Sequence, residues 1–218
     1  MPSDMHRFRD AAIAWAAAAT GAADAELIVR SLAPTIKTVV LVEGPSDAIA
    51  VEVLAARTGR DLDSERIPII PVGGATAIRR FLDPFGPAGL DLRLAGLVDA
   101  AEERFFRQAL QHDRHPELTR DEMEQLGFFV CVPDLEYELI RALGTERTLA
   151  VIAEEGQSKA LHTFRNQPDQ RDRPLEQQLH RFMGTMSGRK RRYARALATS
   201  LRLERLPLPI NRLLAFVH

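Results

Sequence analysis

The sequence has a single cysteine, Cys131, among its 218 residues. One cysteine excludes an internal disulfide and is typical of a reducing compartment, so we expect a cytoplasmic protein. No apolar run approaches the roughly 18 residues that cross a membrane, and no membrane partner is expected. The alanine-rich segment 11–19 is not expected to act as a signal peptide, because Asp4 and Asp10 precede it and alanine is only weakly apolar.

The sequence also lacks a phosphate-binding loop of the pattern Gly-x-x-x-x-Gly-Lys-Ser/Thr. Backbone N–H groups in such a loop cradle the phosphates of a nucleoside triphosphate, so ATP hydrolysis of that kind is not expected from these residues. With 45% hydrophobic and 27% charged residues, the composition is that of an ordinary globular protein. The length suits one sizeable domain with helical additions.

The net charge of −1 conceals an uneven distribution of charge along the chain. Residues 1–156 contain 16 Lys and Arg and 26 Asp and Glu, a balance of −10, whereas residues 157–218 contain 13 and 4, a balance of +9. An acidic body followed by a basic tail suits a cation site that faces a polyanion. The alternative is that the two parts simply attract each other in the folded chain.

The chain is organised around the segment 38–47. Its apolar run 39–42 leads directly to Glu43, and Gly44 and a proline end the run before a helical pattern begins. This order predicts a buried parallel strand, a tight turn and a helix. A carboxylate at the end of such a strand lies where open α/β folds bind ligands, and Asp47 in the first helical turn can face the same crevice. The alternative reading is plain turn and cap chemistry.

Apolar runs alternate with helical patterns through the first two thirds of the chain, which predicts an α/β fold with a mostly parallel sheet of about four strands. The predicted strands are 38–43, 67–72, 92–98 and 128–132. The predicted helices are 5–19, 22–33, 48–57, 76–82, 101–111, 135–143, 146–155, 175–183, 189–203 and 210–217, with polar connections at 112–120 and 166–173.

Acidic residues lie at the ends of three of these strands: Glu43 ends the first, Asp99 directly follows the third, and Asp134 follows the fourth after one intervening residue. The right-handed crossover rule places the carboxyl ends of parallel strands along one edge of the sheet, so we expect these side chains to lie close together. Carboxylate oxygens are the hard ligands that Mg²⁺ prefers, and the edge is therefore a candidate site for Mg²⁺ or Mn²⁺.

The segment Val42-Glu43-Gly44-Pro45-Ser46-Asp47 resembles the first signature of the Toprim domain, and is closest to that of the overcoming-lysogenization-defect (OLD) family endonucleases. In this resemblance Glu43 matches the signature glutamate and Asp47 the acidic residue after it. Gly73 and Gly74 match the glycine turn after the second strand. The run 97–99 matches the start of the Asp-x-Asp signature, and the run 134–136 resembles the acidic motif after the next strand.

The resemblance covers roughly residues 38–143, with weaker similarity in the tail. It implies a Toprim-like, Rossmann-like fold and a metal site whose ligands are Glu43, Asp47, Asp99, Glu102, Asp134 and Glu136. Glu102 enters this set because the second aspartate of Asp-x-Asp is absent: position 101 is Ala, and Glu102 lies about one helical turn beyond Asp99. This departure leaves open whether the site takes one ion or two and how strong its catalysis is.

The densest basic run opens the predicted helix 189–203. Its cations suit contacts with a phosphate backbone, and its tyrosine suits stacking on a base. Lys190 matches in kind the late lysine that the related nucleases use near the scissile phosphate, and it joins Glu43 as a candidate catalytic residue. The alternative is a solvated face that pairs with the acidic body. The candidate nucleic-acid contacts are Arg189, Lys190, Arg191, Arg192, Tyr193 and Arg195.

Taken together, these features predict a divalent-metal-dependent phosphoryl-transfer enzyme on nucleic acid, with a DNA endonuclease favoured. The alternatives are a catalytically weakened module that binds nucleic acid or an ATPase partner, and a small-nucleotide hydrolase. The related nucleases carry an ATPase domain, so a separate ATPase subunit is an expected partner, and an oligomer is compatible with the sequence. The expected organisation is an N-terminal helical segment 1–36, a Toprim-like domain 37–145 and a basic helical extension 146–218.

Overall fold

The computed structural model describes residues 3–111, 118–184 and 188–218. Most of the polar connection predicted at 112–120 lies outside these residues. The described residues contain a sheet of four parallel strands, as the sequence predicts: β1 (Val39–Val42), β2 (Ile69–Pro71), β3 (Leu94–Asp99) and β4 (Phe128–Cys131). Their order is β2-β1-β3-β4, with β1 paired to both β2 and β3. The strand that carries prolines, β2, lies at the edge of the sheet, where a missing N–H donor is tolerated.

Helices surround this sheet. They are α1 (Asp4–Ala16), α2 (Ala22–Leu32), α3 (Pro45–Arg57), α4 (Arg79–Phe85), α5 (Glu103–Gln111), α6 (Arg120–Gln125), α7 (Leu135–Leu143), α8 (Thr145–Glu154), α9 (Ser158–Arg165), α10 (Pro168–Arg171), α11 (Leu175–Gly184), α12 (Arg189–Ser200) and α13 (Leu208–Phe216). The sequence did not predict α6, α9 or the single turn α10, which lies inside the expected connection 166–173. The predicted start of α3, residue 48, is three residues too late. The helix begins at Pro45, since a proline is favourable at the first helical position.

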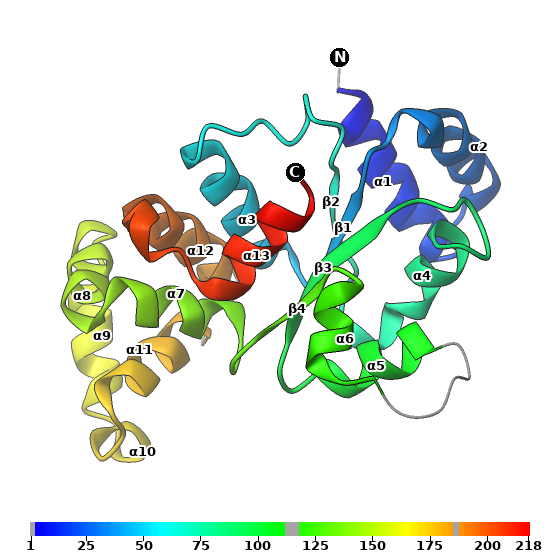
Figure 1. Ribbon diagram of the computed structural model, residues 1–218. Coiled ribbons are helices and arrows are strands. Elements are labelled where there is room, and N and C mark those ends of the chain that lie inside the picture. The colour runs from blue at the N-terminus through cyan, green and yellow to red at the C-terminus, as the bar shows by residue number, and fades with distance from the viewer. Residues whose placement is uncertain (1–2, 112–117, 185–187) are drawn as a thin grey trace.

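The helices cover both faces of the sheet, which gives three layers (Figure 1). Alternate residues of β1 point to opposite faces, as the period of two in a strand requires. Val40 and Val42 belong to a core that contains residues of α3, α7, α12 and α13. Val39 and Leu41 belong to a second core that contains residues of α1, α2, α4 and α5. Burial on both faces explains why the strand is apolar throughout.

The C-terminal helices are joined to the α/β part by polar contacts as well as by apolar packing. Arg57, in the last turn of α3, donates to the carbonyl oxygens of Ala198 and Leu201 at 2.7 and 2.6 Å. Arg212 of α13 pairs with Glu124 at 2.5 Å. None of the described helices combines the length and the hydropathy needed to cross a membrane.

We expect Gly96→Ala to lower the free energy of unfolding by about 1–3 kcal/mol, because a new methyl group in a packed core forces strain. A Cβ atom at position 96, in the middle of β3, would lie 2.5 Å from the carbonyl oxygen of Leu41 on β1. Urea denaturation measures the change. Gly184→Ala is the matched control, since no described residue lies within 4 Å of a Cβ atom there. Equal stability of the two variants would contradict the tight approach of β3 to β1.

Candidate functional site

The carboxyl ends of three neighbouring strands meet at one edge of the sheet. Glu43 directly follows β1, Asp99 is the last residue of β3, and Asp134 lies three residues beyond the end of β4. Because β3 pairs with both β1 and β4, the three positions are adjacent, as the crossover rule predicts. Two further acids come from the first turns of the following helices: Asp47 from α3 and Glu136 from α7. We call these five residues the carboxylate edge.

Glu43 and Asp99 interact directly at the centre of the carboxylate edge. Burial raises the pKa of Glu43, a hydrogen bond with Asp99 opposes this, and Glu102 raises it further. Burial also raises the pKa of Asp99 to about 8, with like-charge repulsion from Asp47 and Glu43 as the next causes. Carboxylates that crowd one another without a compensating cation titrate in this way.

Asp47 combines a structural and an electrostatic role. Its Oδ2 accepts a hydrogen bond of 2.8 Å from the N–H of Gly44, which fixes the turn between β1 and α3. Burial raises the pKa of Asp47 to about 7, and repulsion from Glu136 adds to the rise. The cap expected from the sequence is confirmed, and the metal-ligand role of Asp47 stays a prediction.

The glycine turn after β2 closes against the same loop. The N–H groups of Gly73 and Gly74 lie 3.1 and 3.3 Å from the carbonyl oxygen of Glu43, to which they donate. Both glycines have positive φ, 80° and 111°, which disfavours a side chain at either position. Gly44 differs, because its φ of −141° is extended backbone. The turn at 73–74 thus holds the backbone from which Glu43 projects.

Asp134 is engaged through both of its carboxylate oxygens. Its Oδ1 accepts a hydrogen bond of 2.8 Å from the N–H of Tyr137, which caps α7, and its Oδ2 lies 2.6 Å from Nε2 of His180 on α11. Burial alone would raise the pKa of Asp134, but these contacts outweigh it and lower the pKa. Asp134 therefore positions α7 and its acids. His180 was missed in the sequence, since no local pattern connects it to Asp134.

Glu136 pairs with a lysine beside the carboxylate edge. Its Oε1 lies 3.5 Å from Nζ of Lys190 on α12. The glutamate side chain is only 5% exposed, whereas the lysine is 56% exposed, so the ammonium group faces both the buried acid and the solvent. Partial burial would lower the pKa of Lys190, but attraction to Glu136 and Asp134 raises it. Lys190 therefore lies beside an acid of the carboxylate edge.

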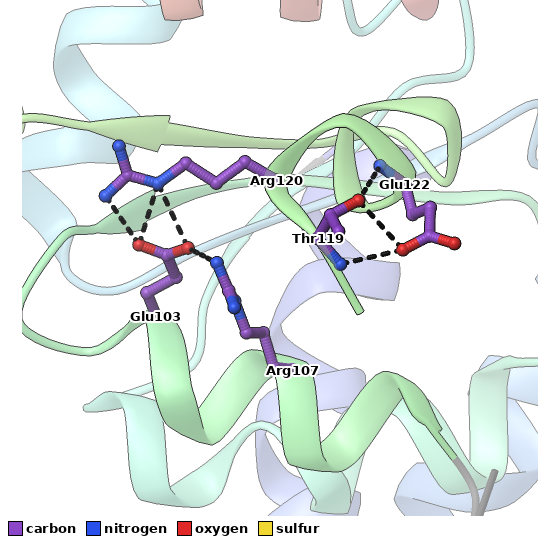
Figure 2. A network of polar contacts seen from close by, with 5 residues as sticks. All are labelled: Glu103, Arg107, Thr119, Arg120 and Glu122. Carbon is purple, nitrogen blue, oxygen red and sulfur yellow. Dashed lines mark hydrogen bonds and ion pairs between the residues drawn. The ribbon is translucent and has the colours of Figure 1, made fainter. Parts of the chain in front are cut away.

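The residues after Asp99 divide between two environments. Glu102 lies near enough to Glu43 to raise its pKa through like-charge repulsion. Glu103 is buried elsewhere and binds both Arg107 and Arg120, as Figure 2 shows. Ala101 is exposed and brings no ligand. Of the two acids that follow Ala101, only Glu102 can stand in for the missing aspartate.

The basic run of α12 does not form a single cationic face. Arg192 pairs with Glu155 at the end of α8, and Arg189 donates to Gln157 at 3.0 Å and packs over the ring of Phe182. These contacts match the alternative in which tail and body attract each other. Arg191 and Arg195 are exposed, together with Lys190.

The prediction that Tyr193 stacks on a base is wrong. Its side chain is 0% exposed and lies in the core against Phe182, with ring centroids 6.2 Å apart. The tyrosine was placed on the surface because its neighbours in the sequence are cations. A helix, however, turns every third or fourth residue to the same side, and position 193 falls on the apolar side of α12 with Ala194 and Leu197.

The donor set of the carboxylate edge fits a hard divalent cation. Glu43 Oε2 and Glu136 Oε1 are buried oxygens without a hydrogen-bond partner, and such orphaned acceptors are costly unless a cation satisfies them. As the side chains stand in the described part of the chain, no three His, Cys, Asp or Glu are grouped tightly enough to hold an ion. The fit therefore rests on the chemistry of the donors and on these two buried oxygens, of which Glu136 Oε1 is the one near Lys190.

A parallel sheet with acids at the carboxyl ends of its strands, between flanking helices, is the arrangement of a Toprim-class α/β domain. Residues 36–100 match the family model described as overcoming lysogenization defect protein-like, TOPRIM domain. This segment of the chain is therefore similar to the Toprim domain of OLD-like proteins. No curated protein matches the chain.

Solved structures extend this likeness beyond the matched segment. The C-terminal region of the Xanthomonas campestris pv. campestris OLD protein is 29% identical, with a TM-score of 0.65, and the match covers 84% of this chain and 94% of that one. The C-terminal region of the Burkholderia pseudomallei OLD protein is 22% identical, with a TM-score of 0.64 and coverage of 84% and 97%. The second likeness shows the fold alone. The expected fold class and family resemblance are thus confirmed.

We expect the melting temperature of the metal-free protein to fall as the pH rises from 6 to 8.5, by on the order of a few degrees per pH unit. The folded-state pKa values of Asp47 and Asp99, about 7 and about 8, lie above the ordinary value of 3.8. Their contribution to stability is therefore complete below pH 3.8 and is lost as the pH rises through about 7 and 8. Thermal melts across this range measure the effect.

The double variant Asp47→Asn, Asp99→Asn is the control for this titration. It removes both carboxyl groups, so its melting temperature should vary less with pH than that of the unaltered protein. A slope that persists unchanged in the variant would assign the pH dependence to other groups.

Proposed function

We propose that the chain is a divalent-metal-dependent phosphodiester hydrolase that acts on nucleic acid, most specifically a DNA endonuclease. Toprim domains generally bind divalent metals, and an OLD-like Toprim domain indicates a metal-dependent function related to nucleic acid. The observation that carries the proposal is the carboxylate edge itself, with Lys190 beside it. A cation site next to a partly exposed ammonium group suits a phosphate ester, which needs its charge neutralised on more than one side.

Glu43, Asp47 and Asp99 would hold the cation, with Glu136 and Glu102 at its sides. When bound, Mg²⁺ or Mn²⁺ would supply an activated water and stabilise charge on the phosphate. Each of these side chains offers carboxylate oxygens, which are the ligands that such a cation requires. Asp134 is better placed to orient Glu136 through the start of α7 than to bind the ion, since both of its oxygens are engaged.

The chain's own groups account for the remaining requirements. Lys190 faces solvent with its ammonium group and would neutralise a non-bridging phosphate oxygen. Glu43 has a raised pKa and an unpaired Oε2, so this oxygen is suited to take up the proton of the attacking water. The turn at 73–74 holds the Glu43 backbone in place through its two N–H groups.

A second candidate function is a nucleic-acid-binding module with weakened catalysis. The specific observation in its favour is Ala101, which stands where the Toprim signature has its second aspartate. Glu102 opposes it, because this acid lies near enough to Glu43 to raise its pKa and could take the place of the absent aspartate. A separate ATPase subunit remains a predicted partner in either case.

We expect Glu43→Gln to reduce metal-dependent cleavage of plasmid DNA by roughly 100-fold or more, because it removes both a ligand and a proton acceptor. The substitution also relieves like-charge repulsion, so the metal-free melting temperature should stay equal or rise slightly, while stabilisation by Mg²⁺ or Mn²⁺ is lost. Plasmid nicking with EDTA controls, together with melts with and without metal, measures both effects.

Glu52→Gln is the matched control, since Glu52 lies on α3 and pairs with Arg9 away from the carboxylate edge. It should leave cleavage and metal response intact. A Glu43→Gln protein that is destabilised yet still metal-responsive would refute the assignment of Glu43 to the site.

We expect Ala101→Asp to tighten Mg²⁺ binding and to raise the cleavage rate, because an added carboxylate completes an oxygen shell around a hard cation. Isothermal titration with Mg²⁺ measures the affinity. Glu102→Gln should weaken binding in the unaltered chain and weaken it less in the Ala101→Asp background, if both acids serve the same position. An unchanged affinity in Ala101→Asp would mean that the site is complete without a second aspartate.

A further inference from the structure

A pocket of about 490 Å³ opens beside the carboxylate edge, outside the residues assigned to it above. One wall is the loop after β4, where Val132 and Pro133 are exposed. The second wall is α7, through Tyr137 and Arg141. The third wall is α11 together with Arg173, which lies just before that helix. Figure 1 shows α7 and α11 side by side next to the end of β4. The pocket thus borders the same sheet edge as the candidate metal site.

Three arginines make the pocket cationic: Arg141, Arg173 and Arg181. Arg141 is partly neutralised, because it pairs with Glu138 at 3.2 Å and donates to the carbonyl oxygen of Val132 at 2.6 Å. No ion pair among the described residues involves Arg173 or Arg181, and both are exposed. Two guanidinium groups without a carboxylate partner, on one wall of a pocket, suit phosphate oxygens.

Tyr137 adds an aromatic surface to this wall. The ring is half-buried, its hydroxyl donates to Glu176 at 3.1 Å, and Arg141 lies over it at 5.3 Å from the ring centroid. These contacts hold the ring in one orientation at the pocket. Arginines with an aromatic side chain form the combination that holds unpaired nucleic-acid strands, with the cations on the phosphates and the ring against a base.

His180 links the pocket to the carboxylate edge. It lines the pocket and contacts Asp134, the residue that caps α7, at 2.6 Å. The ring of His180 also packs edge-on against Tyr137, with centroids 5.6 Å apart. A strand seated in the pocket would therefore continue along the start of α7 toward Glu136 and Lys190.

We propose that this pocket binds a nucleotide of an unpaired nucleic-acid strand, with the phosphates on Arg173 and Arg181 and the base against Tyr137. This inference rests on the proposed function, because it names where the strand beside the cleaved bond is held. It also replaces the stacking role that Tyr193 cannot fill. The observation that carries it is the juxtaposition, in one pocket, of the half-buried Tyr137 and two guanidinium groups without a carboxylate partner among the described residues; Nε of Arg173 donates to the carbonyl oxygen of Asp169 at 2.8 Å.

The test is binding of a fluorescently labelled single-stranded oligonucleotide, measured by anisotropy in EDTA so that no cleavage occurs. The double variant Arg173→Ala, Arg181→Ala should weaken binding and reduce the slope of log K against log salt by about 1.4, since each lost phosphate contact on a single strand contributes about 0.7. Tyr137→Leu should weaken binding at least about fivefold, whereas Tyr137→Phe keeps the ring and should bind as the unaltered protein does.

The matched control is the double variant Arg202→Ala, Arg205→Ala, which removes two exposed arginines from a different pocket. Unchanged binding in this control, with loss in the Arg173 and Arg181 variant, supports the proposal. Equal loss in both arginine pairs, unchanged binding in the Arg173 and Arg181 variant, or no binding of the strand by the unaltered protein overturns it. A Tyr137→Phe protein as weak as Tyr137→Leu overturns the role of the ring.

The outcome separates the pocket from the proposed hydrolase activity. If the protein binds the strand through the pocket but does not nick DNA with Mg²⁺ or Mn²⁺, the pocket proposal stands and the endonuclease proposal is refuted. If the Arg173→Ala, Arg181→Ala variant nicks DNA and binds the strand as well as the unaltered protein does, the endonuclease proposal stands and the pocket proposal is refuted. A duplex competitor of the same sequence shows whether the strand must be unpaired.

Discussion

Crowding of negative charge at one edge of the sheet is the constraint to which the rest of the structure responds. The topology delivers Glu43, Asp99 and Asp134 to adjacent strand ends, and burial makes their repulsion stronger than it would be in water. The negative charge of each acid is compensated by a different partner. Asp134 receives a backbone N–H and His180, Asp47 receives the N–H of Gly44, and Glu136 faces Lys190. Glu43 and Asp99 share a hydrogen bond, and the pKa of each stays raised, which marks the position where a cation has most to gain.

The C-terminal helices supply much of this compensation. Lys190 comes from α12 and His180 from α11, and both reach the edge of a sheet that is built from residues 39–131. The segment that matches the Toprim family model, 36–100, holds three acids of the carboxylate edge and neither of these cationic partners. The site is therefore a joint product of the α/β part and the helices packed on it. The charge asymmetry of the sequence reflects this division, since the body carries the acids and the tail the cations that face them.

The sheet and most of the carboxylate edge could be predicted, because both depend on short-range signals. Apolar runs of four to six residues that end in an acid are visible in the sequence, and parallel topology follows from the helices between them. The start of α6 also has a short-range signal, although α6 is not among the predicted helices. Thr119 and Glu122 form a capping box there, with the threonine N–H donating to the glutamate at 2.8 Å (Figure 2).

The remaining parts depend on which side of a helix faces the core, and that is decided by distant packing. Tyr193 and Arg191 are neighbours in a basic run, yet one lies in the core and the other in solvent. His180 carries no local signature, and its meaning arises only from Asp134, 46 positions earlier. The pocket beside α7 likewise combines residues from three separate segments, which no single-sequence pattern connects.

The contact between α3 and the end of α12 has a consequence for how the protein reaches its native state. Arg57 binds the carbonyl oxygen of Ala198, 141 positions away. Contacts of such long sequence separation form late, because the chain must lose the entropy of closing a large loop before they are made. During synthesis the sheet edge emerges from the ribosome well before α11 and α12. At that stage Asp134 lacks its contact with His180, and Glu136 lacks its contact with Lys190. One face of the sheet is also incomplete at that stage, because its core includes Tyr193 and Leu197 of α12.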